Sequence, residues 1–131
     1  VSSISQLSEI EKIYSPEQLL ILTIAADKLC AKHLPEEFRK YSECICGLGK
    51  SSYLHKVIYE DMMIFDEEKV ADELLTVFKE ACNDNTDALL LECTNMPPYK
   101  QDLKQFKPVK IFDILSAIEA LLPNTVKPTY L

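Results

Sequence analysis

Two uninterrupted apolar runs constrain the fold of this 131-residue chain more than any other feature. The first covers residues 19–26, and the second lies within residues 87–92. Neither run alternates between apolar and polar residues, which is the pattern of a strand covered on both faces. The two runs therefore predict strands of a central parallel sheet. A buried helix that begins at a Ser15 cap, with Pro16 in its first turn, is the alternative for the first run.

Shorter signals fill in the remaining elements. Residues 44–48 and 108–112 are expected to be strands, residues 49–65 mostly loop, and residues 123–131 an irregular tail. Amphipathic spacing and helix-start signals predict helices at about residues 3–14, 27–41, 66–82, 99–106 and 113–122. Strands separated by helices pair in parallel through right-handed crossovers. We therefore expect one α/β domain over residues 1–131, with a three- or four-stranded parallel sheet between two layers of helices.

Charge and composition exclude several classes of function. The 21 acidic residues outnumber the 14 lysines and arginines, and the net charge of -7 opposes contact with a nucleic-acid backbone. With only 2 glycines, the chain cannot build a glycine-rich phosphate loop. We expect no nucleic-acid partner and no nucleotide site of that kind.

The expected compartment is the cytoplasm. No apolar run approaches the ~18 residues of a membrane span, so no membrane partner is expected, and Val1-Ser2-Ser3 does not resemble a signal peptide. The 5 cysteines are an odd number, which favours free thiols over a disulfide framework.

Cys93 is the strongest candidate for chemistry, because it directly follows the strand expected at residues 87–92. Ligands of open parallel sheets bind beyond the carboxyl ends of strands. Backbone N–H groups of a following helix would lower the pKa of a thiol there, and Thr94 and Asn95 offer a hydroxyl and an amide for a small carboxylate. The structural alternative is that Cys93 is a small buried hydrophobe and Asn95 a turn residue.

Other groups of polar or sulfur-containing residues are given structural roles. The spacing of Cys44 and Cys46 relative to the two histidines is not that of a zinc site, so we expect core cysteines and no metal. The acids at residues 66–68 are expected to form the first turn of a helix. We expect Met62 and Met63 to be packing residues. A solvated face is expected for four lysines, Lys100, Lys104, Lys107 and Lys110.

The segment Leu-Glu-Cys-Thr-Asn-Met-Pro-Pro-Tyr at residues 91–99 resembles the second catalytic segment of the aspartate/glutamate racemase family, which includes hydantoin racemases. Lys-Pro-Val at residues 107–109 and Phe-Asp-Ile at 112–114 add to the resemblance. It extends to residues 1–6, 20–26 and 65–69, so it covers nearly the whole chain, and it is loose between residues 30 and 64.

The resemblance implies the second, C-terminal lobe of a protein with two pseudo-symmetric α/β lobes that face each other across a cleft. Each lobe supplies one cysteine, and the two thiols exchange protons with an amino acid or related carboxylate without a metal or another cofactor. In this chain the resemblance assigns the acid/base role to Cys93 and carboxylate binding to Thr94 and Asn95. The partner cysteine would belong to an N-terminal lobe absent from this sequence.

One departure concerns the substrate. Well-studied glutamate racemases have a histidine at the position of Asn95, so the resemblance does not identify the amino acid. Because inversion needs a base on each face of the substrate, we expect this lobe to be inactive alone. A homodimer that pairs two copies of Cys93 is an alternative arrangement. A non-catalytic α/β module that serves assembly or binds a small carboxylate is the alternative function.

Overall fold

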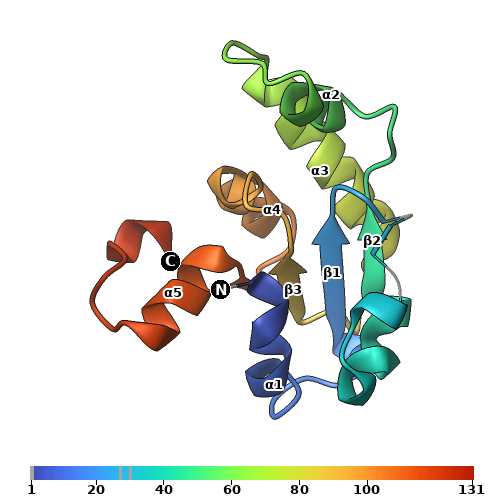
Figure 1. The fold of residues 1–131 in the computed structure, drawn as a ribbon, viewed down its shortest axis with the longest axis vertical. Helices are drawn as coiled ribbons and strands as arrows, with labels where there is room; N and C mark the ends of the chain where they lie inside the picture. The colour runs from blue at the N-terminus through green and yellow to red at the C-terminus, as the bar shows by residue number, and fades with distance from the viewer. Residues whose placement is uncertain (1, 27, 30) are drawn as a thin grey trace.

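A four-stranded parallel sheet forms the centre of the computed structural model, which describes residues 2–26, 28–29 and 31–131. The spatial order is β2-β1-β3-β4 (Figure 1). The strands are β1 (Leu19–Thr23), β2 (Ile45–Gly47), β3 (Ala88–Leu91) and β4 (Lys110–Phe112). The predicted α/β class is confirmed, and the helical alternative for the first apolar run is wrong.

Both faces of the sheet are covered, which explains the uninterrupted apolar runs. Leu22, Leu89 and Leu91 belong to a core on one face, whereas Leu19 and Leu90 belong to a separate core on the other. Successive side chains of a strand point to opposite faces, so every residue of a doubly covered strand must be apolar. The run in β3 is completely buried.

Helices form the two outer layers (Figure 1). The core on the Leu89 face includes residues of α2 (Tyr53–Tyr59), α3 (Glu67–Ala81) and α4 (Lys100–Phe106). The core on the Leu90 face includes residues of α1 (Leu7–Ile10) and of the 3-10 helix η4 (Glu36–Cys44). The last α-helix is α5 (Ile114–Leu121). Short 3-10 helices complete the chain: η1 (Ser3–Gln6), η2 (Pro16–Gln18), η3 (Ala31–His33), η5 (Pro97–Tyr99) and η6 (Pro128–Tyr130). None of the helices described is both long and apolar enough to cross a membrane.

Two helices begin as the sequence predicts. The Asp66 side chain accepts a hydrogen bond from the Lys69 N–H, and the acids Glu67 and Glu68 occupy the first turn of α3. At α5, the Asp113 side chain accepts from the Ser116 N–H at 2.9 Å. Both carboxylates satisfy N–H groups that a helix leaves unpaired at its start.

The helix predicted at residues 3–14 is wrong in extent. The structure has a 3-10 turn followed by the four residues of α1. Side chains here bond to nearby backbone carbonyls: the Ser5 hydroxyl donates to Ser2, the Gln6 amide to Ser3 and the Ser8 hydroxyl to Ser5. Such local bonds compete with a regular helix.

The region expected to be helical at residues 27–41 contains only the 3-10 helices η3 and η4 among its described residues. Asp27 and Cys30 lie outside the described residues. Pro35 lies directly before η4, which continues to Cys44. The predicted strand at residues 44–48 is consequently shorter than expected and begins at Ile45. The strand predicted at 108–112 is also shorter, and begins at Lys110.

The loop predicted for residues 49–65 contains α2, which the sequence analysis missed. Ser52 caps it by accepting from the His55 N–H at 3.2 Å. The Glu73 carboxylate of α3 also accepts from the N–H groups of Tyr53 and Leu54, at 2.7 and 3.1 Å. This helix therefore depends on a tertiary partner that a local periodicity does not show.

Candidate functional site

The chain changes direction across the sheet between β1 and β3, and their carboxyl ends form the expected ligand-binding edge. From β1 the chain moves to β2 on one side, and then returns to β3 on the other side of β1. In open α/β sheets, ligands bind beyond the carboxyl ends of strands at such a change of direction. Cys93 follows β3 at this edge, separated from the strand by Glu92.

Side chains connect the ends of these two central strands. The Thr23 hydroxyl at the end of β1 donates a hydrogen bond of 2.8 Å to the Glu92 carboxylate after β3. The Ala25 N–H donates to the same hydroxyl oxygen at 3.3 Å. This pair was not singled out as a site from the sequence. It fixes the start of the loop that carries Cys93.

The thiol of Cys93 is half-buried and has an amide beside it. The Asn95 side-chain nitrogen lies 3.9 Å from the Cys93 sulfur. The Met96 N–H donates to the Cys93 carbonyl at 3.2 Å, which closes a turn around the two residues between them. Helix α4 begins only at Lys100, so the polar neighbour is a side-chain amide rather than the helix start expected from the sequence.

Thr94 and Asn95 are exposed, and Thr94 borders two cavities whereas Asn95 borders one. A cavity of about 400 Å³, here called the Tyr99 pocket, has both residues in its wall together with Tyr99, Glu67 and Met62. Burial raises the pKa of the Tyr99 hydroxyl, and the Glu67 carboxylate raises it further.

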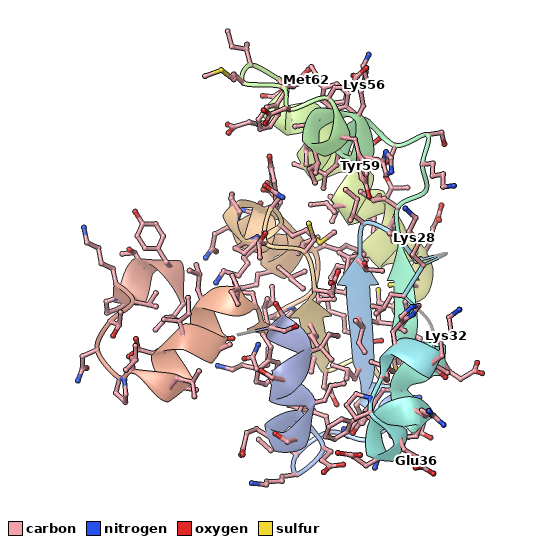
Figure 2. All side chains as sticks on the ribbon, in the orientation of Figure 1. Lys28, Lys32, Glu36, Lys56, Tyr59 and Met62 are labelled. Carbon is pink, nitrogen blue, oxygen red and sulfur yellow. The ribbon has the colours of Figure 1, made fainter. Side chains whose placement is uncertain are left out.

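Met62 lies at the α2 end of the molecule (Figure 2), where its N–H donates to the Val57 carbonyl at 2.9 Å. Met62 is partly buried, as expected for a packing residue. The same expectation is wrong for Met63, whose exposed fraction is 95%.

The second cavity, of about 500 Å³, has Thr94 in its wall together with Lys100, and is here called the Lys100 pocket. Cys93 borders neither cavity. The predicted solvated face is wrong for Lys100, which is buried with its ammonium 2.8 Å from the buried Asp113 carboxylate. This pair could not be predicted from the sequence, because Lys100 and Asp113 belong to different elements.

Two of the other cysteines behave as core residues. Burial raises the pKa of the Cys44 thiol to about 11, with a contribution from Glu17, and the Cys44 thiol donates to the Pro16 carbonyl at 3.1 Å. Burial also raises the pKa of Cys46 to about 11. Cys82 is partly buried, and Cys30 lies outside the described residues.

Within the described ranges, no three His, Cys, Asp or Glu side chains gather closely enough to hold a metal ion. Comparison with protein-family models, with curated proteins and with solved structures finds no match to this chain.

Proposed function

We propose that this chain is the C-terminal lobe of a cofactor-independent amino-acid racemase related to the aspartate, glutamate and hydantoin racemases. The observation that carries the proposal is the position of Cys93, which is half-buried after β3, where the chain changes direction across the sheet between β1 and β3. The neighbouring Asn95 amide and the exposed Thr94 hydroxyl lie in the same turn. A thiol and two carboxylate-binding groups on one loop suit proton exchange next to a substrate carboxylate.

The proposed reaction is a proton transfer at the α-carbon. The Cys93 thiolate takes the α-proton and becomes a thiol, which leaves a carbanion stabilised by the adjacent carboxyl group. A second thiol on the opposite face gives its proton to the carbanion and becomes a thiolate, so the product has inverted configuration. Hydrogen bonds from Thr94 and Asn95 would stabilise the negative charge that develops on the carboxylate.

The first lobe would supply the second thiol and cover the loop that carries Cys93. In the isolated lobe, Thr94 and Asn95 are exposed, so a bound carboxylate would face water. Fixed hydrogen-bond donors stabilise a developing charge most effectively where water is excluded. The missing lobe would therefore provide both a catalytic group and the enclosure.

Competitive alkylation of the folded chain tests the proposed thiol. Iodoacetamide is added below saturation at pH 7.5, and labelling of each cysteine is measured by mass spectrometry. Cys93 is expected to react faster than Cys30, Cys44, Cys46 and Cys82, and the pKa values of about 11 at Cys44 and Cys46 keep those two thiols protonated. A Cys93→Ser variant identifies the Cys93 signal, and circular dichroism verifies the fold.

If Cys93 in the folded chain is labelled no faster than the other cysteines, its thiol is not activated. That result would favour the non-catalytic alternative, in which the lobe serves assembly or binds a small carboxylate through Thr94 and Asn95.

A further inference from the structure

Residues 123–131, here called the strap, follow α5 and fold back beside it at the edge of the molecule (Figure 1). The turn begins at Asn124, whose φ of 68° lies in the left-handed region that asparagine tolerates better than most residues. The Glu119 carboxylate accepts hydrogen bonds from three successive backbone N–H groups of the strap, those of Asn124, Thr125 and Val126, at 2.6, 3.1 and 2.8 Å. A single side chain of α5 thus holds the near end of the strap.

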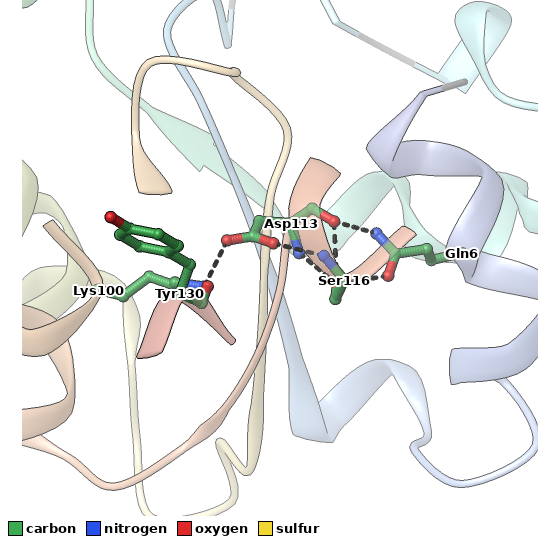
Figure 3. Close-up of polar contacts among 5 residues, drawn as sticks. All are labelled: Gln6, Lys100, Asp113, Ser116 and Tyr130. Carbon is green, nitrogen blue, oxygen red and sulfur yellow. Dashed lines mark hydrogen bonds and ion pairs between the residues drawn. The ribbon is translucent and has the colours of Figure 1, made fainter. Parts of the chain in front are cut away.

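The far end of the strap is held by a buried charge. The Lys100 ammonium donates to the Tyr130 carbonyl at 2.5 Å and lies 2.8 Å from the Asp113 carboxylate (Figure 3). The Lys100 side chain is 8% exposed and that of Asp113 is completely buried. A buried ammonium is costly unless acceptors surround it, so the carbonyl of the strap stabilises a group that water barely reaches.

The strap also forms one wall of the Lys100 pocket. Thr129 and Tyr130 border this cavity of about 500 Å³. Two pairs of apolar residues also line the cavity, Pro97 with Pro98 and Ile114 with Leu115. The side chains of residues 127–131 are themselves exposed. The strap is therefore held by backbone contacts at its two ends more than by burial of its own side chains.

We propose that the surface formed by Lys100, Pro97, Pro98, Ile114 and Leu115 is a docking site for a short peptide, and that the strap, which reaches this surface through the Tyr130 carbonyl, is its occupant within the same chain and detaches as a unit. The site selects an uncharged carbonyl rather than a carboxylate. Asp113 already neutralises Lys100, so a carboxylate at the same ammonium would add a second negative charge in a buried place. The proline and aliphatic walls favour an apolar or aromatic side chain next to that carbonyl. This inference is independent of the chemistry of Cys93, which does not border the pocket.

Hydrogen exchange of the full chain, measured by mass spectrometry, tests whether the strap detaches separately. Glu119→Gln and Asn124→Ala weaken the strap in different ways, while Glu80→Gln is a matched change at an exposed site on α3. Exchange within residues 123–131 is expected to accelerate at least about tenfold in the first two variants, with β3 unchanged, because separate structural units open independently. Strap exchange equal to that of Glu80→Gln, or equal acceleration in β3, would overturn the proposal.

Binding in trans tests the chemistry of the site. The peptide acetyl-Lys-Pro-Thr-Tyr-Leu-amide, which repeats residues 127–131, is added to the Glu119→Gln chain, and the Ile114 and Leu115 methyl signals are followed by NMR. A saturable shift is expected, which is lost on adding Lys100→Met and kept with the matched Lys104→Met. No shift, or a shift that survives Lys100→Met, refutes peptide docking at Lys100.

Two further measurements complete the test. If Lys100→Met exchanges hydrogen faster in β3, its fold is disturbed and Leu115→Asn is used in its place. Leu115→Asn makes the apolar wall of the site polar, so the peptide-induced shift at Ile114 is expected to be lost. Sodium acetate replaces the peptide in a parallel titration. An equal effect of acetate on the same methyl groups would contradict the preference for an uncharged carbonyl.

Discussion

At the scale of single residues, the cysteines differ mainly in their surroundings. Cys44 and Cys46 are held by the core and have pKa values of about 11, whereas Cys93 lies in a turn beside the Asn95 amide. The sequence predicted Cys93 as the candidate because of its place after a strand, and the structure puts it there. The sequence could not show that the neighbouring donor is an amide, because the turn at residues 93–96 depends on how the backbone folds locally.

The buried thiols should show a characteristic pH dependence. At pH 7 a thiol with a pKa of about 11 is ionised in only about one molecule in ten thousand. Labelling of Cys44 and Cys46 in the folded chain should therefore rise about tenfold per pH unit from pH 7 to pH 10. Because folding raises these pKa values above 9, the folded chain should also lose stability as the pH rises from about 9 towards 11.

Iodoacetamide labelling at several pH values, with unfolding by urea at each, measures both effects. If the labelling rate of Cys44 and Cys46 reaches a plateau below pH 9, burial does not raise the pKa of these two thiols.

At the scale of elements, the apolar runs and helix caps were sufficient to predict the strands, α3 and the start of α5. They were not sufficient for α2, which is seven residues long and depends on Glu73 of a neighbouring helix. Nor could they predict the pairing of Lys100 with Asp113, since these residues come from two elements that meet only in the folded chain. Local patterns predict elements with their own caps and stripes, and miss those that tertiary partners complete.

Gly47 should be the position of β2 least tolerant of a side chain. A Cβ atom there would lie 1.9 Å from the Thr23 carbonyl oxygen of β1, whereas a Cβ at Gly49 would meet nothing within 4 Å. Gly47→Ala should therefore lower the free energy of unfolding by about 1–3 kcal/mol, because the backbone of the sheet must shift. Gly49→Ala is the matched control and should change it far less.

Urea denaturation of the two alanine variants makes this comparison. Equal stability of Gly47→Ala and Gly49→Ala would mean that β1 and β2 do not approach as closely as described.

Glu73→Ala should release the start of α2. The variant removes the acceptor for the Tyr53 and Leu54 N–H groups, and loss of such a cap costs about 0.5–2 kcal/mol. Hydrogen exchange is expected to accelerate across residues 53–59 and to remain slow in β3. Glu80→Ala on the same helix, α3, is the control. If exchange of residues 53–59 accelerates as much in Glu80→Ala as in Glu73→Ala, Glu73 does not cap α2.

At the scale of the whole molecule, the proposed function requires more than this lobe. The chain alone should not racemise aspartate, glutamate or a hydantoin, because the proposed site supplies one thiol for two proton transfers. Incorporation of solvent deuterium at Cα, followed by NMR together with the optical rotation of the product, measures this directly. Exchange with inversion that disappears in Cys93→Ala would reveal a second base within the chain or in a second copy of it.

The order of strands has a further consequence for how this chain behaves in solution. Its two outer strands, β2 and β4, are only three residues long, and the outer strand β4 begins with the exposed Lys110. Unpaired strand edges can template sheet extension from one molecule to the next, and short edges that include lysine resist it. The sheet therefore offers little backbone to edge-to-edge aggregation, and the solubility of the chain at high concentration should depend on its exposed helices and not on its sheet.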